Sequence, residues 1–443
     1  MKKEGVFKEG IFNENPLSLL KFIYYFRDYF IPMKKALLLA TLISPAVAMA
    51  QNNNAPSSYD PHDIKITGYL QTQFQKAQSP GITSFSGGDF SKNSDNRFMI
   101  RRGRLKIDRV DTYSSIVFQI DATQDGVQLM DAFIQLRHPD QKGLSLTAGL
   151  FNRPFGYSIV YSSGYRDFPE RARVFQTLMP RERDLGGMVS YHPGGKMKFL
   201  NLDLALVNGS GHSAKDYDSK KDLIGNLGFK FDSLADKRLH LGFGGSFYKG
   251  SVRNDTKTYY TAIANGYTAH TSDDNEGKGI GRNYYGANLQ IELDNSFGKS
   301  SFKTEYVAGD QPGVAGGADI KGPYASRSFT TQPATDLYQR KFNGYYLWLT
   351  QEIAKTGVTA LLAYDVYDPN TKASGMTIGM PDNFTADGDV KFSTLGYGVA
   401  YQISNRLKLT VYNEHVTNEK TSLKNFSDDL KDNVFTTRLL YRW

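Results

Sequence analysis

The sequence predicts an all-β fold: a transmembrane antiparallel β-barrel of about 16 strands, with an inward-folded constriction loop after the fifth strand. Three observations predict the barrel. Segments of about ten residues alternate apolar and polar side chains, as half-buried strands do. Short connections between the segments alternate with mostly long ones, which is typical of barrels with tight turns at one rim and long loops at the other. The last segment ends on an aromatic residue, Trp443, in phase with Leu439 and Tyr441.

Residues 1–62 are expected to lie outside the barrel domain, which is residues 63–443. Residues 33–50 read MKKALLLATLISPAVAMA. A basic start, an apolar stretch and a small-x-small end predict a secretory signal peptide that is cleaved after Ala50. Residues 51–62 form a polar linker. Residues 1–32 are interpreted as an upstream extension from a misassigned start codon, and the alternative is a membrane anchor built on LSLLKFIYYF.

The expected strands share a two-residue period, and in each the apolar face is assigned to lipid. In hydrocarbon every backbone N–H and C=O group must pair within the protein, so such a sheet has to close on itself. Leu289 and Ile291 exemplify the lipid face, and Asn288 and Gln290 exemplify the opposite, water-facing side. The expected strands are 64–74, 97–109, 114–122, 126–138, 143–151, 185–192, 197–207, 223–231, 238–248, 283–294, 301–308, 342–353, 357–367, 391–403, 406–416 and 433–443.

Composition excludes several other classes of protein. The mean hydropathy is −0.45, and no uncharged apolar run reaches the roughly 20 residues of a membrane helix. Residues 1–50 carry seven Lys or Arg and four Asp or Glu, so their removal lowers the formal net charge from +8 to +5, which predicts no nucleic acid partner. There is no cysteine, and the seven histidines lack the spacing of a metal site. The acidic loops 272–279 and 386–390 are interpreted as solvated rather than as Ca²⁺ sites. We predict no catalytic residue, metal or cofactor.

The segment FPERARVFQTLMPRERDLGG, residues 168–187, breaks the alternation and gathers charge. Residues 168–179 fit a short helix that folds into the barrel lumen. Guanidinium groups offer a fixed fork of donors to phosphate or carboxylate, and rings of basic residues favour the passage of anions. The predicted anion-binding constriction contains Arg153, Arg166, Arg171, Arg173, Arg181 and Arg183. The alternative is an extracellular loop in which Arg and Glu only pair with each other.

A second basic cluster, RFMIRRGRLKID, begins at residue 97. Its apolar phase slips near Arg101, as a β-bulge would allow, so that two successive arginines turn inward. Because so many charges are implausible in lipid, they are expected to face the lumen. The predicted pore-wall residues are Arg101, Arg102, Arg104, Lys106 and Arg137. Other inward positions carry both signs: Lys230, Lys303, Lys408, Arg438, Asp121, Asp131, Glu292, Glu305 and Glu414.

In order and spacing, RRGRLKID, VQLMDAFIQL, LTAGLFNRPFG, FPERARVFQ and RDLGGMVSY resemble the phosphate-selective porin O and P family. The resemblance is closest over residues 97–192. It implies a trimeric, 16-stranded anion channel with Arg171 and Arg173 at the constriction and Arg101, Arg102 and Arg104 where a basic ladder begins along the wall. The chain departs from the family in one respect, because its loop holds Arg but no counterpart of the central binding Lys.

Together these features predict a porin of the bacterial outer membrane that is not an enzyme. Its expected partners are outer-membrane lipid, two further copies of itself in a homotrimer, and small inorganic anions, with phosphate as a candidate. The alternatives are a general, weakly selective porin and a non-channel barrel that acts as an enzyme or an adhesin.

Overall fold

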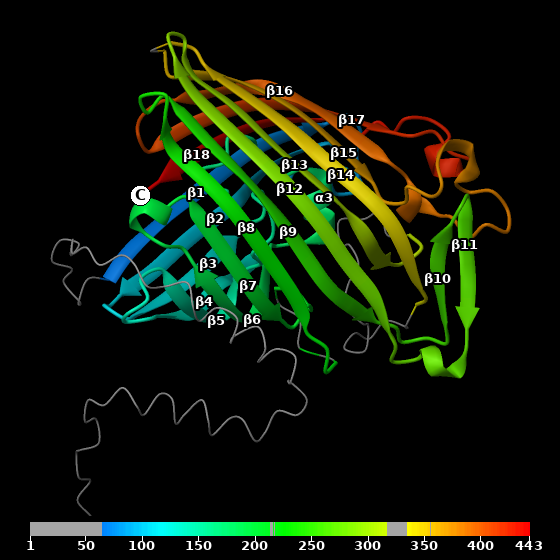
Figure 1. Ribbon diagram of the computed structural model, residues 1–443. Coiled ribbons are helices and arrows are strands. Elements are labelled where there is room, and N and C mark those ends of the chain that lie inside the picture. Colours follow the sequence, from blue (N-terminus) through cyan, green and yellow to red (C-terminus); the bar gives the residue numbers. More distant parts are fainter. Residues whose placement is uncertain (1–63, 213–215, 217, 317–334, 355) are drawn as a thin grey trace, which may run out of the picture. The chain divides into compact units, whose positions relative to one another are not determined.

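The computed structural model describes residues 64–212, 216, 218–316, 335–354 and 356–443. Within this part of the chain, 16 antiparallel wall strands close into a barrel (Figure 1). Each wall strand pairs with the next along the chain, and β1 pairs with β18 to complete the ring. The barrel prediction is therefore confirmed. The predicted upstream extension, signal peptide and linker lie outside the described residues.

The strand bounds follow the expected segments closely, although several strands are longer than their alternating cores. The first eight wall strands are β1 (Ile64–Ala77), β2 (Asn96–Val110), β3 (Ser114–Thr123), β4 (Gly126–Arg137), β5 (Leu144–Asn152), β6 (Arg183–Tyr191), β7 (Leu200–Val207) and β8 (Asp222–Leu234). The other eight are β9 (Leu239–Arg253), β12 (Gly279–Asn295), β13 (Gly298–Gly313), β14 (Leu337–Glu352), β15 (Val358–Asp368), β16 (Phe392–Gln402), β17 (Leu407–Asn418) and β18 (Val434–Arg442).

One long connection, expected as a loop over 249–282, contains a further hairpin. Its strands are β10 (Thr258–Ile263) and β11 (Gly266–Thr271). The hairpin does not interrupt the wall, because β9 pairs directly with β12. Figure 1 shows the hairpin beyond the rim opposite the C-terminus. The signal that could have found it is the dipeptide Asn265–Gly266, which marks a turn in a sequence. In the structure Gly266 pairs with Ile263, so the central turn residues are Ala264 and Asn265, and Asn265 has φ of 63°.

Side-chain exposure alternates along the wall strands as the sequence predicts. On β14, Leu347 and Leu349 are 38% and 45% exposed, whereas Trp348 between them is 3% exposed. On β18, Leu439 is exposed and Leu440 is buried. The outer face is therefore apolar and exposed, and the buried positions face the barrel interior. Among the described residues, no helix combines the length and hydropathy of a membrane span.

The predicted bulge in β2 is confirmed. Gln71 of β1 pairs with Arg102, but the next residue, Thr72, pairs with Ile100, so Arg101 is the extra residue. A bulge changes the phase of a strand by one residue. This places Phe98 and Ile100 on the outer face and allows Arg101 and Arg102 to turn inward together.

Candidate functional site: the loop after β5 and the inner wall

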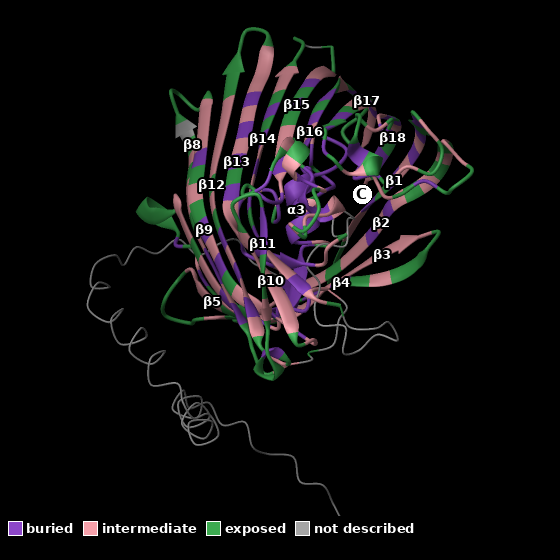
Figure 2. Cartoon of the chain, turned by 90° about the vertical axis from the view of Figure 1, so that its right-hand side faces the viewer, coloured by how far each residue is buried: buried purple, intermediate pink, exposed green. Residues whose placement is uncertain are grey.

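The loop of residues 153–182, between β5 and β6, contains one short helix, α3 (Arg173–Leu178). The sequence predicted a helix within 168–179, and the helix that forms is shorter because the segment before Ala172 bends instead. A helix of one to two turns is unstable alone, so its stability comes from packing. Figure 2 shows α3 within the ring of strands. The loop ends with Arg181 and Glu182 in the left-handed region, at φ of 59° and 62°.

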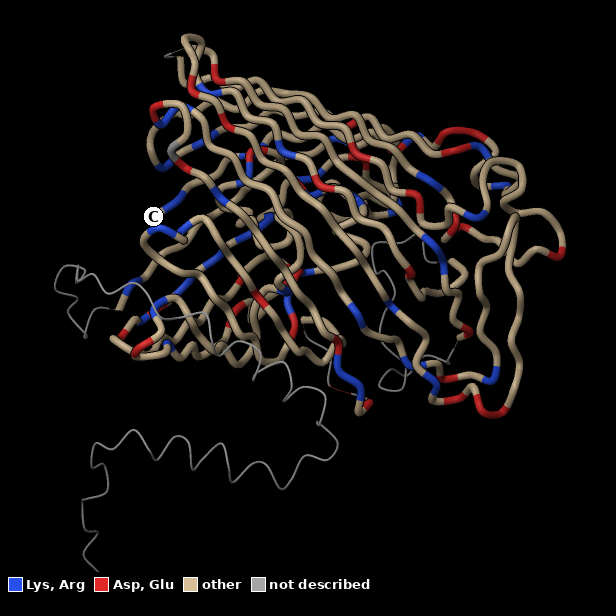
Figure 3. The backbone as a smooth tube through the Cα atoms, viewed as in Figure 1, with Lys and Arg blue, Asp and Glu red and all other residues tan. Residues whose placement is uncertain are grey.

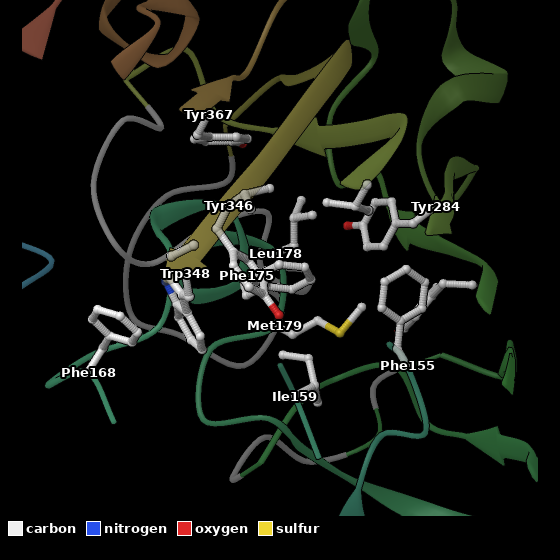
Figure 4. Packing of buried hydrophobic residues seen from close by; sticks show 14 of the residues in the cluster. Phe155, Ile159, Phe168, Phe175, Leu178, Met179, Tyr284, Tyr346, Trp348 and Tyr367 are labelled. Carbon is white, nitrogen blue, oxygen red and sulfur yellow. The ribbon is translucent and has the colours of Figure 1, made fainter. Parts of the chain in front are cut away.

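Apolar side chains hold the loop against inward-facing aromatic residues of the wall. Phe175 is fully buried, and its ring meets Tyr346 of β14 edge to face, with centroids 6.0 Å apart. Phe168 packs on Trp348, with ring centroids 5.1 Å apart (Figure 4). Its ring also meets that of Tyr412 of β17, with centroids 5.9 Å apart. Burying a large apolar side chain stabilises by about 1.5–3 kcal/mol. The cluster therefore fixes the loop to the β14–β17 side of the barrel.

On the other side of the loop, Glu170 accepts hydrogen bonds from three arginines. Arg101 Nε and Nη2 donate to its two carboxylate oxygens at 2.9 and 3.0 Å. Arg102 Nη2 donates at 2.7 Å, and Arg438 Nη2 of β18 also donates at 2.7 Å. Burial alone would raise the pKa of Glu170, but the three guanidinium groups hold that pKa well below its usual range. Glu170 is therefore a buried carboxylate that stays charged.

The arginines at the end of the loop are also paired with carboxylates. Arg171 and Arg183 both donate to Glu182. Arg183 also pairs with Asp131 of β4, at 2.9 Å. Burial would raise the pKa of Glu182, and Arg171 and Arg183 lower that pKa instead. Charges of both signs are thus matched here.

Two other arginines of the predicted constriction, Arg153 and Arg181, also have polar partners within the protein. Arg153 pairs with the buried Asp184 at 2.9 Å. Arg181 is exposed and donates to Gln128. Arg153, Arg171 and Arg183 are thus paired with carboxylates of the loop or of the wall. The alternative interpretation of the sequence expected such pairing between Arg and Glu.

Arg173, at the start of α3, lies between aromatic rings. Its guanidinium carbon is 3.7 Å from the ring centroid of Phe392 and 4.3 Å from that of Phe85. Burial lowers its pKa to about 10, and the carboxylates of Asp432 and Asp365 offset part of that effect. Cation–π contacts of a desolvated arginine stabilise by about 2 kcal/mol. Arg173 therefore contributes to holding the helix against the wall.

Arg166 differs from the other loop arginines. It is 3% exposed, and none of its three guanidinium nitrogens has a hydrogen-bond partner among the described residues. Burial lowers its pKa well below the usual value, and the nearby Arg171 and Arg102 lower it further. The carboxylates of Glu170 and Glu182 offset part of that lowering, so Arg166 is a desolvated guanidinium with charges of both signs around it.

The predicted pore-wall residues beyond the Glu170 cluster are Arg104, Lys106 and Arg137, and each has a different environment. Arg104 pairs with Asp121 at 3.2 Å. Lys106 is partly exposed and lines a cavity of about 950 Å³ inside the wall of β2–β13. Arg137 instead donates to the backbone carbonyls of Asp111 and Ser114, so it fastens the turn between β2 and β3.

The cavity lining carries both charges and many amides. Its residues include Lys106, Lys230, Asp131, Asp203, Glu292, Asn226, Asn288 and Gln290. Figure 3 likewise shows Lys and Arg interspersed with Asp and Glu along the wall. The wall therefore carries charges of both signs and is not uniformly basic.

Sequence reasoning missed two buried ion pairs beyond the loop. Arg282 of β12 pairs with Asp222, which also accepts a hydrogen bond from Tyr248. Arg340 of β14 pairs with Asp389 at 2.9 Å. Inward parity identifies each arginine as facing the lumen, but the partner lies on a distant segment. Within the described ranges, no group of three or more His, Cys, Asp or Glu residues is placed to hold a metal ion.

Both the sequence and the fold are similar to those of known porins. The family model for phosphate-selective porin O and P matches residues 81–443. No curated protein matches the sequence at a significant level. Among solved structures, the outer membrane channel DcaP of Acinetobacter baumannii superposes with a TM-score of 0.50 at 13% identity, covering 86% of this chain and 97% of that one. Salmonella typhi OmpF in complex with daunomycin gives 0.49 at 10% identity, covering 86% and 97%.

Proposed function

This chain belongs to the phosphate-selective porin O and P family, and from that premise we propose that its outer-membrane channel passes small anions by diffusion through a constriction formed by the loop after β5. Family and fold indicate a channel rather than an enzyme. No covalent step is involved, because the channel acts through its field and geometry: basic groups offset the hydration that an ion loses and release it again.

The observation that carries the proposal is the buried Arg166. Leaving a guanidinium desolvated and without hydrogen bonds costs several kcal/mol, unless an anion supplies the missing partner. Arg171 and Arg102 lie near it, but each is paired with a carboxylate, so the charge left without a partner at this place is that of Arg166 itself. An anion entering the loop region therefore gains an attraction that a cation does not. Arg166 is the residue through which we expect selectivity to act.

Reversal potentials in planar bilayers under a KCl gradient test the proposal. We expect the wild-type channel to prefer Cl⁻, and Arg166→Gln to lose a substantial part of that preference. Arg406→Gln is the matched control, because Arg406 is exposed in the turn between β16 and β17 and the change removes the same charge. A channel that prefers K⁺, or a purified barrel that forms no channel, would refute the proposal.

Phosphate specificity is a finer proposal that rests on the family. The absence of Lys from residues 153–184 and the mixed cavity lining favour the general, weakly selective porin as its competitor. Block of the chloride current by inorganic phosphate separates the two. Half-block at concentrations well below those of chloride supports a phosphate channel, and a current indifferent to phosphate supports the general porin.

Export and assembly complete the proposal. We propose cleavage after Ala50 and a homotrimer in the outer membrane, as the signal-like segment and the family imply. Amino-terminal sequencing of the mature protein should begin at Gln51. Light scattering in detergent should give three times the mass of the mature chain.

A further inference from the structure

Glu170 is the most heavily bonded carboxylate of the loop. Five guanidinium N–H groups reach its two oxygens, from Arg101, Arg102 and Arg438. Arg101 and Arg102 each donate to both oxygens, and Arg438 donates to one. Paired, parallel N–H bonds of this kind are how arginines recognise carboxylate and phosphate. The cluster thus has the donor set of an oxyanion site.

The charges of this cluster do not balance. Among the described residues, the ion pairs of Arg101, Arg102 and Arg438 are all made with Glu170, so three cations share one carboxylate. The neighbouring cluster at Glu182 differs, because its two arginines share two carboxylates, those of Glu182 and Asp131. The charge left over at Glu170 matches an anion that carries more than one negative charge.

We propose that Arg101, Arg102 and Arg438 form a binding site for multivalent oxyanions, and that the Glu170 carboxylate occupies this site as an internal competitor. The inference rests on the proposed anion channel and adds to it a carboxylate of the chain itself that competes with the solute for these three arginines. A multivalent anion displaces the Glu170 side chain, binds the three guanidinium groups and leaves when the carboxylate returns. Glu170 thereby weakens a site that would otherwise hold its anion too tightly to conduct.

Two of the three arginines, Arg102 and Arg438, stay in position when the carboxylate swings away, because amides of β1 hold them from the wall. Arg438 Nε donates to Gln73 Oε1 at 2.8 Å, and Arg102 Nη1 donates to Gln71 Oε1 at 3.0 Å. Both glutamines are buried. A site whose donors are already oriented binds its anion without first having to be ordered.

Exchange requires only a side-chain movement. The backbone on both sides of Glu170 is anchored, by Phe168 against Trp348 and by the fully buried Val174 of α3. The entering anion meets Arg101 first, because its side chain is 24% exposed, whereas those of Arg102 and Arg438 are 6% and 5% exposed.

The test compares Glu170→Gln with Asp167→Asn. Both substitutions lie in the same loop and remove one negative charge, but within the described part of the chain Asp167 makes a single ion pair, with Lys303 at 3.2 Å. The readout is block of the chloride current by inorganic phosphate at pH 8, where phosphate is mostly a dianion. We expect Glu170→Gln to lower the half-blocking concentration by about tenfold or more, because three charged donors lose their internal partner. Asp167→Asn should lower it by no more than about twofold.

Equal effects of the two variants would overturn the inference, since they would show only a general change in potential. Adding Arg102→Gln to Glu170→Gln should return the half-blocking concentration toward the wild-type value, and a double variant that keeps the gain also contradicts the site. If Glu170→Gln does not fold, Glu170→Asp withdraws the carboxylate by one methylene. It should lower the half-blocking concentration by a smaller factor, and no change there counts against the site.

The two proposals fail differently. A wild-type channel that prefers K⁺ removes the proposed anion conduction and this inference with it. A wild-type channel that prefers Cl⁻, together with matching phosphate block in Glu170→Gln and Asp167→Asn, removes the inference alone.

Discussion

Replacing Phe175 with alanine should release the loop after β5 while leaving the barrel intact. Phe175 is fully buried, it lies in the middle of a six-residue helix, and its ring contacts Tyr346 across the interface between loop and wall. So short a helix has no stability of its own, and its docking depends on such contacts. The wall strands keep their backbone pairing whether or not the ring is present.

The magnitude follows from burial. Truncating a buried phenylalanine to alanine costs about 3–5 kcal/mol, which combines the lost transfer free energy with the cavity left behind. At 1.4 kcal/mol for each tenfold change, the undocked population of the loop rises by roughly two to three and a half orders of magnitude. That increase makes transient opening accessible to a protease, because cleavage of an opened segment follows its population.

Limited trypsin digestion in detergent measures this opening. Cleavage after Arg166, Arg171 and Arg173 should accelerate strongly in Phe175→Ala, since these arginines are buried only while the loop is docked. Leu349→Ala on the outer face of β14 is the control, because it removes a similar apolar volume from the lipid side and should leave the loop protected. Unchanged cleavage in Phe175→Ala, or unfolding of the whole barrel together with the loop, would refute the reasoning.

Three further predictions concern the loop and its surroundings. Because the pKa of Glu182 is lowered on folding, its contribution to stability is present above its ordinary pKa of 4.5 and is lost as the pH falls below that value. Pepsin should therefore cut the loop progressively faster below pH 4.5. A constant rate of cleavage would contradict the pairing. Burial raises the pKa of Asp432 to about 6 from 3.8, with Arg173 offsetting part of the rise, and Asp432 Oδ1 has no hydrogen-bond partner in the described structure. Ionisation of Asp432 hence costs stability from pH 3.8 upward and in full above pH 6, so Asp432→Asn should stabilise the protein at pH 8 by up to about 3 kcal/mol and have no effect at pH 3.5; thermal melts at the two pH values decide this. Gly156 has φ of +61°, and a methyl group there would meet the carboxylate of Glu305; Gly156→Ala should lower the melting temperature, whereas the same change at Gly194, which has open space, should not.

Period-two patterning was sufficient to predict the barrel because a barrel wall has only two environments. On β14, for example, the exposed Leu347 and Leu349 and the buried Trp348 follow the parity of the sequence. The bulge at Arg101 was equally predictable, because a phase slip in the pattern has one structural cause. The hairpin β10–β11 was missed, although Asn265–Gly266 carried its signal, because its strands lie beyond the wall and do not show the lipid-facing pattern.

The partners of the loop arginines could not be predicted, since they depend on contacts between residues far apart in the chain. Glu170 meets Arg438 across 268 positions. The register of strands fixes which residues are neighbours in the sheet, but the path of an irregular loop fixes which of them it touches. The sequence therefore indicated a basic segment without indicating which of its arginines were neutralised. Of the six predicted constriction arginines, Arg166 and Arg173 have guanidinium groups without a hydrogen bond among the described residues, and only that of Arg173 lies against aromatic rings there.

The pairing pattern changes how selectivity should be estimated in a pore of this kind. Counting arginines overstates the field, because a guanidinium that shares a carboxylate attracts a passing anion only weakly once it is paired. What remains is the excess of cations over carboxylates within each cluster: about neutral at Glu182, positive at Glu170, and positive at Arg166. Since these last two lie within one anchored loop, neutralising Arg166 and neutralising Glu170 should move anion preference in opposite directions. A loop that served only as a structural strut would instead lose protection from protease in both variants and shift the reversal potential in neither.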